Sequence, residues 1–172
     1  MSDNKSMHPV VFILGSDSDL PQLEGGFELL RHFQVPFEVR ILSAHRTPHE
    51  CVDVAARAEE EGAKVLIAAA GMAAALPGVL AAHSMLPVIG VPIGGSALSG
   101  VDALYSMVQM PGGVPVASTG IGKAGGKNAV LVAIRILALH DPDLAIRHRA
   151  WVNSQRERGL ATDKEVQARY RS

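Results

Sequence analysis

Several features that assign a chain to a common protein class are scarce in this sequence. It contains a single cysteine, Cys51, so it cannot close an intramolecular disulfide, and this fits a reducing compartment. The net charge of -1 at pH 7 gives no sign of the basic surface that nucleic-acid binding requires. The first residues lack the basic and apolar pattern of a secretion signal. We therefore expect a cytoplasmic protein that does not bind nucleic acid.

Charge is scarcest in the middle of the chain. Between residues 65 and 122 the only formally charged residue is Asp102, whereas an average soluble segment of that length would carry roughly a dozen charges. Residues 65–82 are long enough to raise the possibility of a membrane span. However, Gly71 and Pro77 interrupt them, and much of the rest is alanine. We predict burial in a sheet core and against other subunits, in a homo-oligomer without a membrane role.

Motifs that mark several enzyme classes are also missing. We find no metal-ligand cluster, no GxSxG nucleophile elbow and no Walker loop, so we expect no metal site. Cys51 falls within a predicted helix and has no neighbouring base, which indicates a packing residue and not a nucleophile.

The residues that are present alternate between two patterns. Short apolar runs predict strands at 10–15, 37–42, 64–70, 87–92 and 113–118. Helical patterns cover 20–33, 47–61, 74–83, 99–108, 127–139 and 142–158. This alternation predicts an α/β fold with three layers, in which a doubly wound parallel sheet of about five strands lies between helices, as in flavodoxin-like and Rossmann-like proteins.

The predicted domain organisation is simple. We expect residues 1–8 to form a flexible end, residues 9–158 a single catalytic domain and residues 159–172 a polar tail. The second helix has a well-marked start, because Thr47 stands before Pro48, and Glu50 follows three residues after Thr47. That spacing predicts a capping box.

The unusual polar residues fall at one edge of this sheet. In doubly wound sheets, ligands bind beyond the carboxyl ends of the strands. The first four predicted strands end in the sequences "GSDSD", "SAHRTP", "AAGMAAALPG" and "GVPIGGSALSG". These four loops are therefore predicted to face one ligand site.

The first loop, "GSDSD", has two interpretations. Asp19 can cap the following helix, or Ser16, Ser18 and Asp19 can bind a phosphorylated sugar through hydroxyls, backbone N–H groups and a carboxylate. Two other families have acids at this position. A receiver domain would also need an acid after the third strand, and a D-x-D phosphatase would need later acids for magnesium. The sequence supplies neither.

The second and third loops differ in chemistry. Arg46 is suited to hold a dianion, and His45 is suited to acid–base work near neutral pH. The alternative is a solvated loop pair. The third loop, residues 69–78, has no side chain able to move a proton. Its small residues permit close approach of a planar ring or a carboxylate, or equally a tight contact between helix and sheet.

Taken together, the motifs resemble a known family. "GSDSD", "SAHRTP", "ALPG", "SGVDALYSMVQMPGGVPV" and "GKAGGKNA" are similar, in this order, to motifs of the PurE family of N5-carboxyaminoimidazole ribonucleotide mutases. The resemblance covers about residues 10–139 and favours the mutase class. It implies purine biosynthesis, a ribonucleotide substrate, no cofactor and a homo-octamer. A direct carboxylase of the same fold, or a non-catalytic nucleotide-binding relative, is the alternative.

The resemblance also implies roles for individual residues. Ser16, Ser18 and Arg46 would bind the 5′-phosphate, Asp19 the ribose hydroxyls, and His45 would be the general acid and base. The remaining substrate-binding positions would be Ser43, Gly71, Ala73, Ala74 and Leu76. One position departs from the family pattern, because Ala75 stands where the family usually has a histidine before "LPG".

Overall fold

The sheet is the centre of the fold. The structure, a computed structural model, describes residues 7–171. Its five strands are β1 (Val10–Leu14), β2 (Phe37–Ile41), β3 (Val65–Gly71), β4 (Val88–Ile93) and β5 (Ala117–Ser118). They are parallel and lie in the order β2-β1-β3-β4-β5. Parallel neighbours need crossover connections, and helices provide them.

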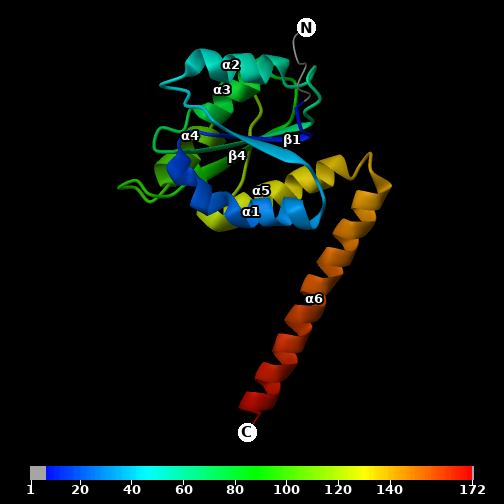
Figure 1. Ribbon diagram of the computed structural model, residues 1–172. Helices are drawn as coiled ribbons and strands as arrows, with labels where there is room; N and C mark the ends of the chain where they lie inside the picture. Colours follow the sequence, from blue (N-terminus) through cyan, green and yellow to red (C-terminus); the bar gives the residue numbers. More distant parts are fainter. Residues whose placement is uncertain (1–6, 172) are drawn as a thin grey trace. The chain divides into compact units, whose positions relative to one another are not determined.

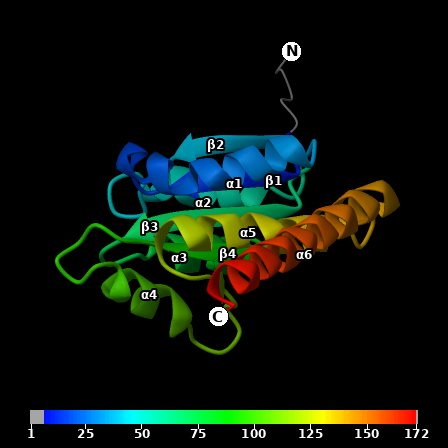
Figure 2. The same cartoon turned by 90° about the horizontal axis from the view of Figure 1, so that it is seen from below.

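Helices cover both faces of the sheet. The α-helices of the described residues are α1 (Leu20–His32), α2 (Pro48–Arg57), α3 (Leu76–His83), α4 (Val101–Val108), α5 (Gly122–Leu137) and α6 (Pro142–Tyr170). In Figures 1 and 2, α1 and α5 lie on one face, and α2 and α3 on the other. The predicted three-layer α/β class is therefore confirmed. The chain divides into two compact units, Met1–Ala133 and Ile134–Ser172, and the sheet belongs to the first.

Side chains of successive residues in β1 alternate between the two layers. The Phe12 ring meets Phe27 of α1 edge-on, with ring centroids 5.0 Å apart, and Phe27 stacks on Phe37 of β2. The neighbouring residues Val11 and Ile13 belong to the core cluster on the other face, which holds buried residues of α2, α3 and α4. This period of two is what a strand covered on both faces requires.

Burial accounts for the scarcity of charge in part of the middle segment. All six residues of β4 and the first six of β3 are buried, so ionised side chains there would lose their hydration. Within residues 7–171, none of the helices combines the length and apolar character needed to cross a membrane.

The boundaries of several elements differ from the predicted ones. Strand β5 has only two residues, α5 begins at Gly122 instead of 127, and α6 continues through most of the predicted polar tail to Tyr170. The tail was predicted only to be polar; its helix formers, among them Leu160, Ala161 and Lys164, extend α6 despite Gly159. Met7, inside the predicted flexible end, is buried and donates its N–H to Glu61 at 2.6 Å; residues 1–6 lie outside the described residues.

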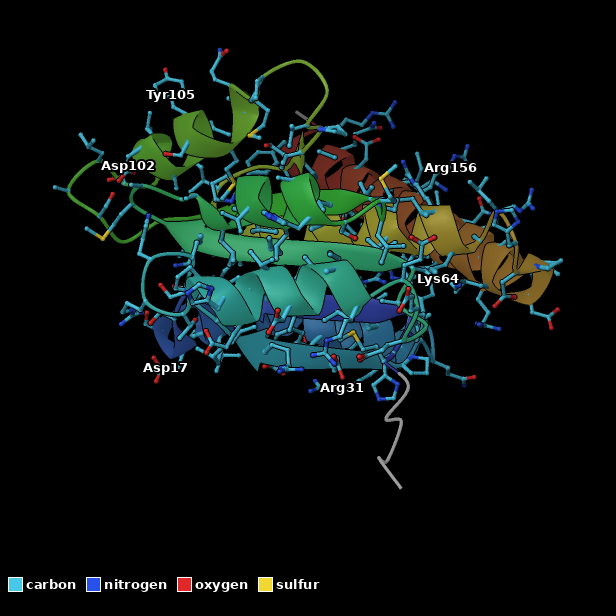
Figure 3. All side chains as sticks on the ribbon, turned by 90° about the horizontal axis from the view of Figure 1, so that it is seen from above. Asp17, Arg31, Lys64, Asp102, Tyr105 and Arg156 are labelled. Atoms are coloured by element: carbon cyan, nitrogen blue, oxygen red, sulfur yellow. The ribbon has the colours of Figure 1, made fainter. Side chains whose placement is uncertain are left out.

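The topology fixes where a ligand would bind. The strand order reverses between β1 and β3, and doubly wound sheets of this order bind ligands at the carboxyl ends beside that switch point. Figure 3 shows Asp17, which follows β1, and Asp102, which follows β4, toward one end of the sheet, whereas Lys64, which precedes β3, lies at the opposite end.

Candidate active site

One cavity lies at the carboxyl ends of β1 to β4, with a volume of about 770 Å³. All residues proposed from the sequence line it: Ser16, Ser18, Asp19, Ser43, His45, Arg46, Gly71, Ala73, Ala74 and Leu76. They come from three loops that are far apart in the sequence. The parallel topology of the sheet brings these loops together.

The loop after β1 gathers hydroxyl groups. Ser16 is extended and precedes a 3-10 turn at Asp17–Asp19. The Ser18 hydroxyl lies 2.8 Å from the Ser16 hydroxyl, and the Ser18 N–H donates to the same Ser16 oxygen at 3.3 Å. Two hydroxyls this close, at the start of a helical segment, form a surface that suits an anion's oxygens.

Asp19 is the buried charge of the site. Only 7% of its surface is exposed, and burial raises the pKa of its carboxyl above the ordinary value, although hydrogen bonds from Ser16 and Ser18 oppose the shift. It stands at the N-cap of α1, yet its side chain makes no capping hydrogen bond. The capping interpretation of Asp19 is therefore wrong; its carboxylate accepts a hydrogen bond from the Ser18 hydroxyl at 3.4 Å and lines the cavity, where a ligand can supply further donors.

The loop after β2 is closed by Thr47. Its hydroxyl accepts from the N–H of Ser43 at 2.8 Å and donates to the carbonyl of Ser43 at 3.1 Å. Thr47 is the N-cap residue of α2 but makes no side-chain cap hydrogen bond. The predicted capping box is therefore wrong, because the Thr47 hydroxyl is used within the loop that carries His45 and Arg46.

Arg46 joins the first two loops. Its Nη2 donates to the carbonyl of Gly15 at 3.0 Å, so the guanidinium lies beside the Ser16 loop. His45 is exposed and lines the same cavity. The cavity therefore brings together a guanidinium, two serine hydroxyls and an imidazole. This suits a ligand whose phosphate is held by the first two groups and which reacts at an atom away from the phosphate.

The loop after β3 contributes backbone and small side chains. Met72 has φ +55°, a left-handed conformation that costs an L-residue about 1–2 kcal/mol. A side chain at Gly71 would lie 3.3 Å from the Ile93 carbonyl, which leaves little room. The first turn of α3 follows at Leu76, where helix N–H groups lack intrahelical partners. This wall can approach a planar or anionic group closely.

Ten further residues line the cavity that were assigned no binding role from the sequence, although all of them except Gln22 lie in the four loops predicted to face the site. They are Gly15, Gln22, Ala44, Ala70, Met72, Ala75, Ile93, Gly94, Gly95 and Ser96. The glycine pair after β4 was a usable signal, since that loop was expected at this edge. Gln22 gave none, because it lies in a helix and only the tertiary fold brings it to the cavity.

Cys51 is not among the residues that line this cavity. Cys51 is buried in the core cluster, as expected of a packing residue, and burial raises the pKa of its thiol. In the described residues 7–171, no group of three or more His, Cys, Asp or Glu side chains could hold a metal ion.

The chain matches a known protein family over most of its length. The family model described as AIR carboxylase matches residues 9–158. The chain belongs to this family. The resemblance to PurE proteins is thereby confirmed, and it extends beyond the motifs to nearly the whole chain.

Relatives of this family differ in name and length. The N5-carboxyaminoimidazole ribonucleotide mutase of Escherichia coli (strain K12) is 46% identical over 160 residues, 93% of this chain and 95% of that protein. The mutase of Synechocystis sp. is 54% identical over 140 residues, 81% of this chain and 78% of that protein. A phosphoribosylaminoimidazole carboxylase of Candida glabrata is 49% identical over 148 residues, 86% of this chain but 26% of that longer protein.

Solved structures agree with the family. The crystal structure of Treponema denticola PurE superposes with a TM-score of 0.80 and 29% sequence identity, covering 91% of this chain and 96% of that one. The likeness therefore includes the arrangement of the strands and helices as well as the sequence.

Proposed function

We propose that this protein is an N5-carboxyaminoimidazole ribonucleotide mutase of purine biosynthesis, an isomerase that moves a carboxylate from the exocyclic N5 to ring carbon C4. The observation that carries the proposal is the likeness to relatives of that name over nearly their whole length, such as 46% identity over 95% of the Escherichia coli protein. The convergence of His45, Arg46 and Ser16 on one cavity supports it.

The phosphate end of the substrate is assigned to the first two loops. Ser16, Ser18 and Arg46 bind the 5′-phosphate, and Asp19 accepts hydrogen bonds from the ribose hydroxyls. The bond from Arg46 to the Gly15 carbonyl supports this, because it holds the guanidinium beside the serines before any ligand binds.

His45 is assigned the proton transfers. As the N5–carboxylate bond breaks, His45 gives a proton to N5, and carbon dioxide and aminoimidazole ribonucleotide stay in the cavity. C4 then attacks the carbon dioxide, and His45 removes the C4 proton, so the ring recovers its aromaticity and the reaction has no net proton change. Ser43, Gly71, Ala73, Ala74 and Leu76 complete the pocket around the base and carboxylate. We assign no cofactor and no metal to these steps.

A direct carboxylase is the second candidate. It is favoured by one observation, the 49% identity to the Candida glabrata phosphoribosylaminoimidazole carboxylase. That enzyme class would join free carbon dioxide to C4 of aminoimidazole ribonucleotide. A non-catalytic nucleotide-binding protein is the third possibility, and Ala75 motivates it.

Two incubations separate the three. One supplies the N5-carboxylated nucleotide, and the other supplies aminoimidazole ribonucleotide with bicarbonate. We expect rapid formation of the C4-carboxylated product from the first and slow formation from the second. The reverse order would favour the direct carboxylase, and turnover of neither would leave a binding protein.

The setting of the enzyme is also proposed. Residues 9–158, the range of the family match, form the catalytic domain, and residues 159–172 are a C-terminal extension of it. The enzyme works in the cytoplasm as a homo-octamer. Exposed apolar side chains in the charge-poor segment support assembly; they include Met72, Leu98, Val101, Tyr105 and Val108.

A further inference from the structure

Gln22 makes a hydrogen bond between two of the segments that line the cavity. It lies in the first turn of α1, and its Nε2 donates to the carbonyl of Gly94 at 2.8 Å. Helix α1 follows β1 and Gly94 follows β4, and β3 lies between those two strands in the sheet. The bond therefore passes over the end of β3 and connects two walls that the sheet itself keeps apart.

The segment that receives this bond has little rigidity of its own. Gly94 and Gly95 are adjacent, and Gly95 has φ +135°, a conformation that favours glycine. A methyl group at Gly95 would meet no atom within 4 Å, so no packing restrains this position. Both glycines line the cavity. A Cβ at Gly94 would meet Ile121 and the Ser99 carbonyl at 3.6 Å, so only Gly95 lies in open space, and a glycine there samples many conformations unless its neighbours are held in place.

The far end of the segment is fixed to α4. The Ser96 hydroxyl donates to Asp102 at 2.9 Å, and the N–H of Leu98 donates to the Ser96 hydroxyl at 3.2 Å. Gln22 fixes the near end, Gly94. The wall formed by residues 94–96 is thus held at both ends, once by its own helix and once by α1.

The oxygen of the Gln22 amide lies close to the start of α5. A Cβ at Gly122, the first residue of α5, would lie 3.1 Å from the Gln22 Oε1. Gly122 has φ +71°, so glycine is favoured there on backbone grounds as well. The absence of a side chain at residue 122 leaves the space in which the amide rests while it donates to Gly94.

We propose that Gln22 is a positioning residue for the carboxylate transfer, which holds the wall of residues 94–96 against the loop at Gly71. The inference rests on the proposed function. The transfer needs carbon dioxide to stay beside C4 after it leaves N5, and a closed wall is what prevents its escape and excludes water. Gln22 touches neither reacting atom; it acts through Gly94.

The first test uses no substrate. Gln22→Met keeps the length and bulk of the side chain but cannot donate to Gly94. Hydrogen exchange of the Leu98 and Ser99 amides, which donate to the Ser96 hydroxyl at 3.2 Å and to the Ser96 carbonyl at 3.0 Å, should then become about three- to tenfold faster, the usual effect of removing one neutral hydrogen bond. Gln167→Met is the matched control, because Gln167 donates to Asp163 at the same distance, 2.8 Å, on α6. Unchanged exchange at residues 98 and 99 would overturn the proposal.

The second test follows the carboxylate. With the N5-carboxylated nucleotide as substrate, the fraction of turnovers that release free aminoimidazole ribonucleotide should rise about three- to tenfold in Gln22→Met and stay at the wild-type value in Gln167→Met, after subtraction of the decay without enzyme. A wild-type release fraction in Gln22→Met would overturn the positioning role. A wild type that forms no C4 product would instead overturn the proposed function, and the exchange test would still decide whether Gln22 holds the wall.

Discussion

His45 and Arg46 are adjacent residues with separable proposed roles. His45→Asn should lower turnover by roughly 10²- to 10⁴-fold, the usual contribution of a positioned acid–base group, and should change substrate affinity little. Arg46→Ala should instead raise KM and weaken inhibition by simple phosphorylated ribosides, since a charge-assisted contact is lost. Steady-state kinetics of both variants measure the separate effects on turnover and on KM. Near-normal turnover of His45→Asn would contradict the assignment.

Asp19 links stability to pH. Burial raises the pKa of its carboxyl, so ionisation is less favourable in the folded than in the unfolded chain. The resulting destabilisation is absent below the unfolded pKa and complete above the folded pKa. Asp19→Asn should therefore unfold at a higher temperature than wild type at neutral pH, and the difference should fade as the pH falls through the folded pKa. Thermal scans from pH 7 to 3.5 test this.

The same substitution should weaken substrate binding, because an amide is a poorer acceptor for ribose hydroxyls than a carboxylate. A variant with a lower melting temperature at pH 7 would contradict this account of Asp19. Such a result would mean that the ionised carboxylate stabilises the folded protein, whereas this account expects its burial to be destabilising.

Ala75 is exposed and lines the cavity without a polar atom in its side chain. If a histidine here holds the migrating carboxylate, Ala75→His should strengthen binding of carboxylated nucleotides or raise turnover about ten- to a hundredfold, the worth of one hydrogen bond to a charged group. Affinity for aminoimidazole ribonucleotide should hardly change. Ala82→His, at an exposed position of α3, is the control. Unchanged or lower activity of Ala75→His would mean that the loop amides suffice.

At the scale of elements, the loop between β2 and α2 depends on Thr47. Thr47→Val keeps the shape but removes both hydrogen bonds to Ser43. We expect turnover to fall about tenfold, because His45 and Arg46 lose their fixed position. Thr47→Ser keeps the hydroxyl and should retain most activity. Equal activities of the valine and serine variants would show that the hydroxyl does not position the loop.

The sequence predicts elements better than it predicts how polar side chains are used. Five strands could be located because β-branched runs such as residues 10–14 alternate with helical patterns, and the same topology predicted which loops meet. The spacing of Thr47 and Glu50 was equally regular but misleading, because Ser43 competes for the Thr47 hydroxyl. Such competition depends on the path of the loop, which no local pattern records.

The same limit applies to the cavity. Side chains on loops directly after strands were predictable, because the ends of parallel strands share an edge. Gln22 could not be found this way, since its partner, Gly94, is 72 residues away in the sequence. The length of α6 was missed for another reason: its residues after 158 are exposed, so no apolar periodicity marks them.

At the scale of the whole molecule, the charge-poor segment presents exposed apolar side chains. Tyr105 on α4 is 65% exposed and projects from the outer side of the helix in Figure 3. We expect sedimentation at micromolar concentration to show an assembly of several copies, and we expect Tyr105→Glu to weaken it. Leu139→Glu, at a residue 77% exposed outside this segment, should assemble normally. A stable wild-type monomer would contradict the proposed assembly.

The central claim is that the protein moves a carboxylate within one nucleotide. The direct measurement supplies the N5-carboxylated nucleotide with ¹³C in its carboxylate, in a buffer that contains unlabelled bicarbonate, and follows the label by NMR. We predict that nearly all of the C4-carboxylated product retains ¹³C, because the carbon dioxide does not leave the cavity between the two steps. Product that carries unlabelled carbon from bicarbonate, or no product at all, would contradict the claim.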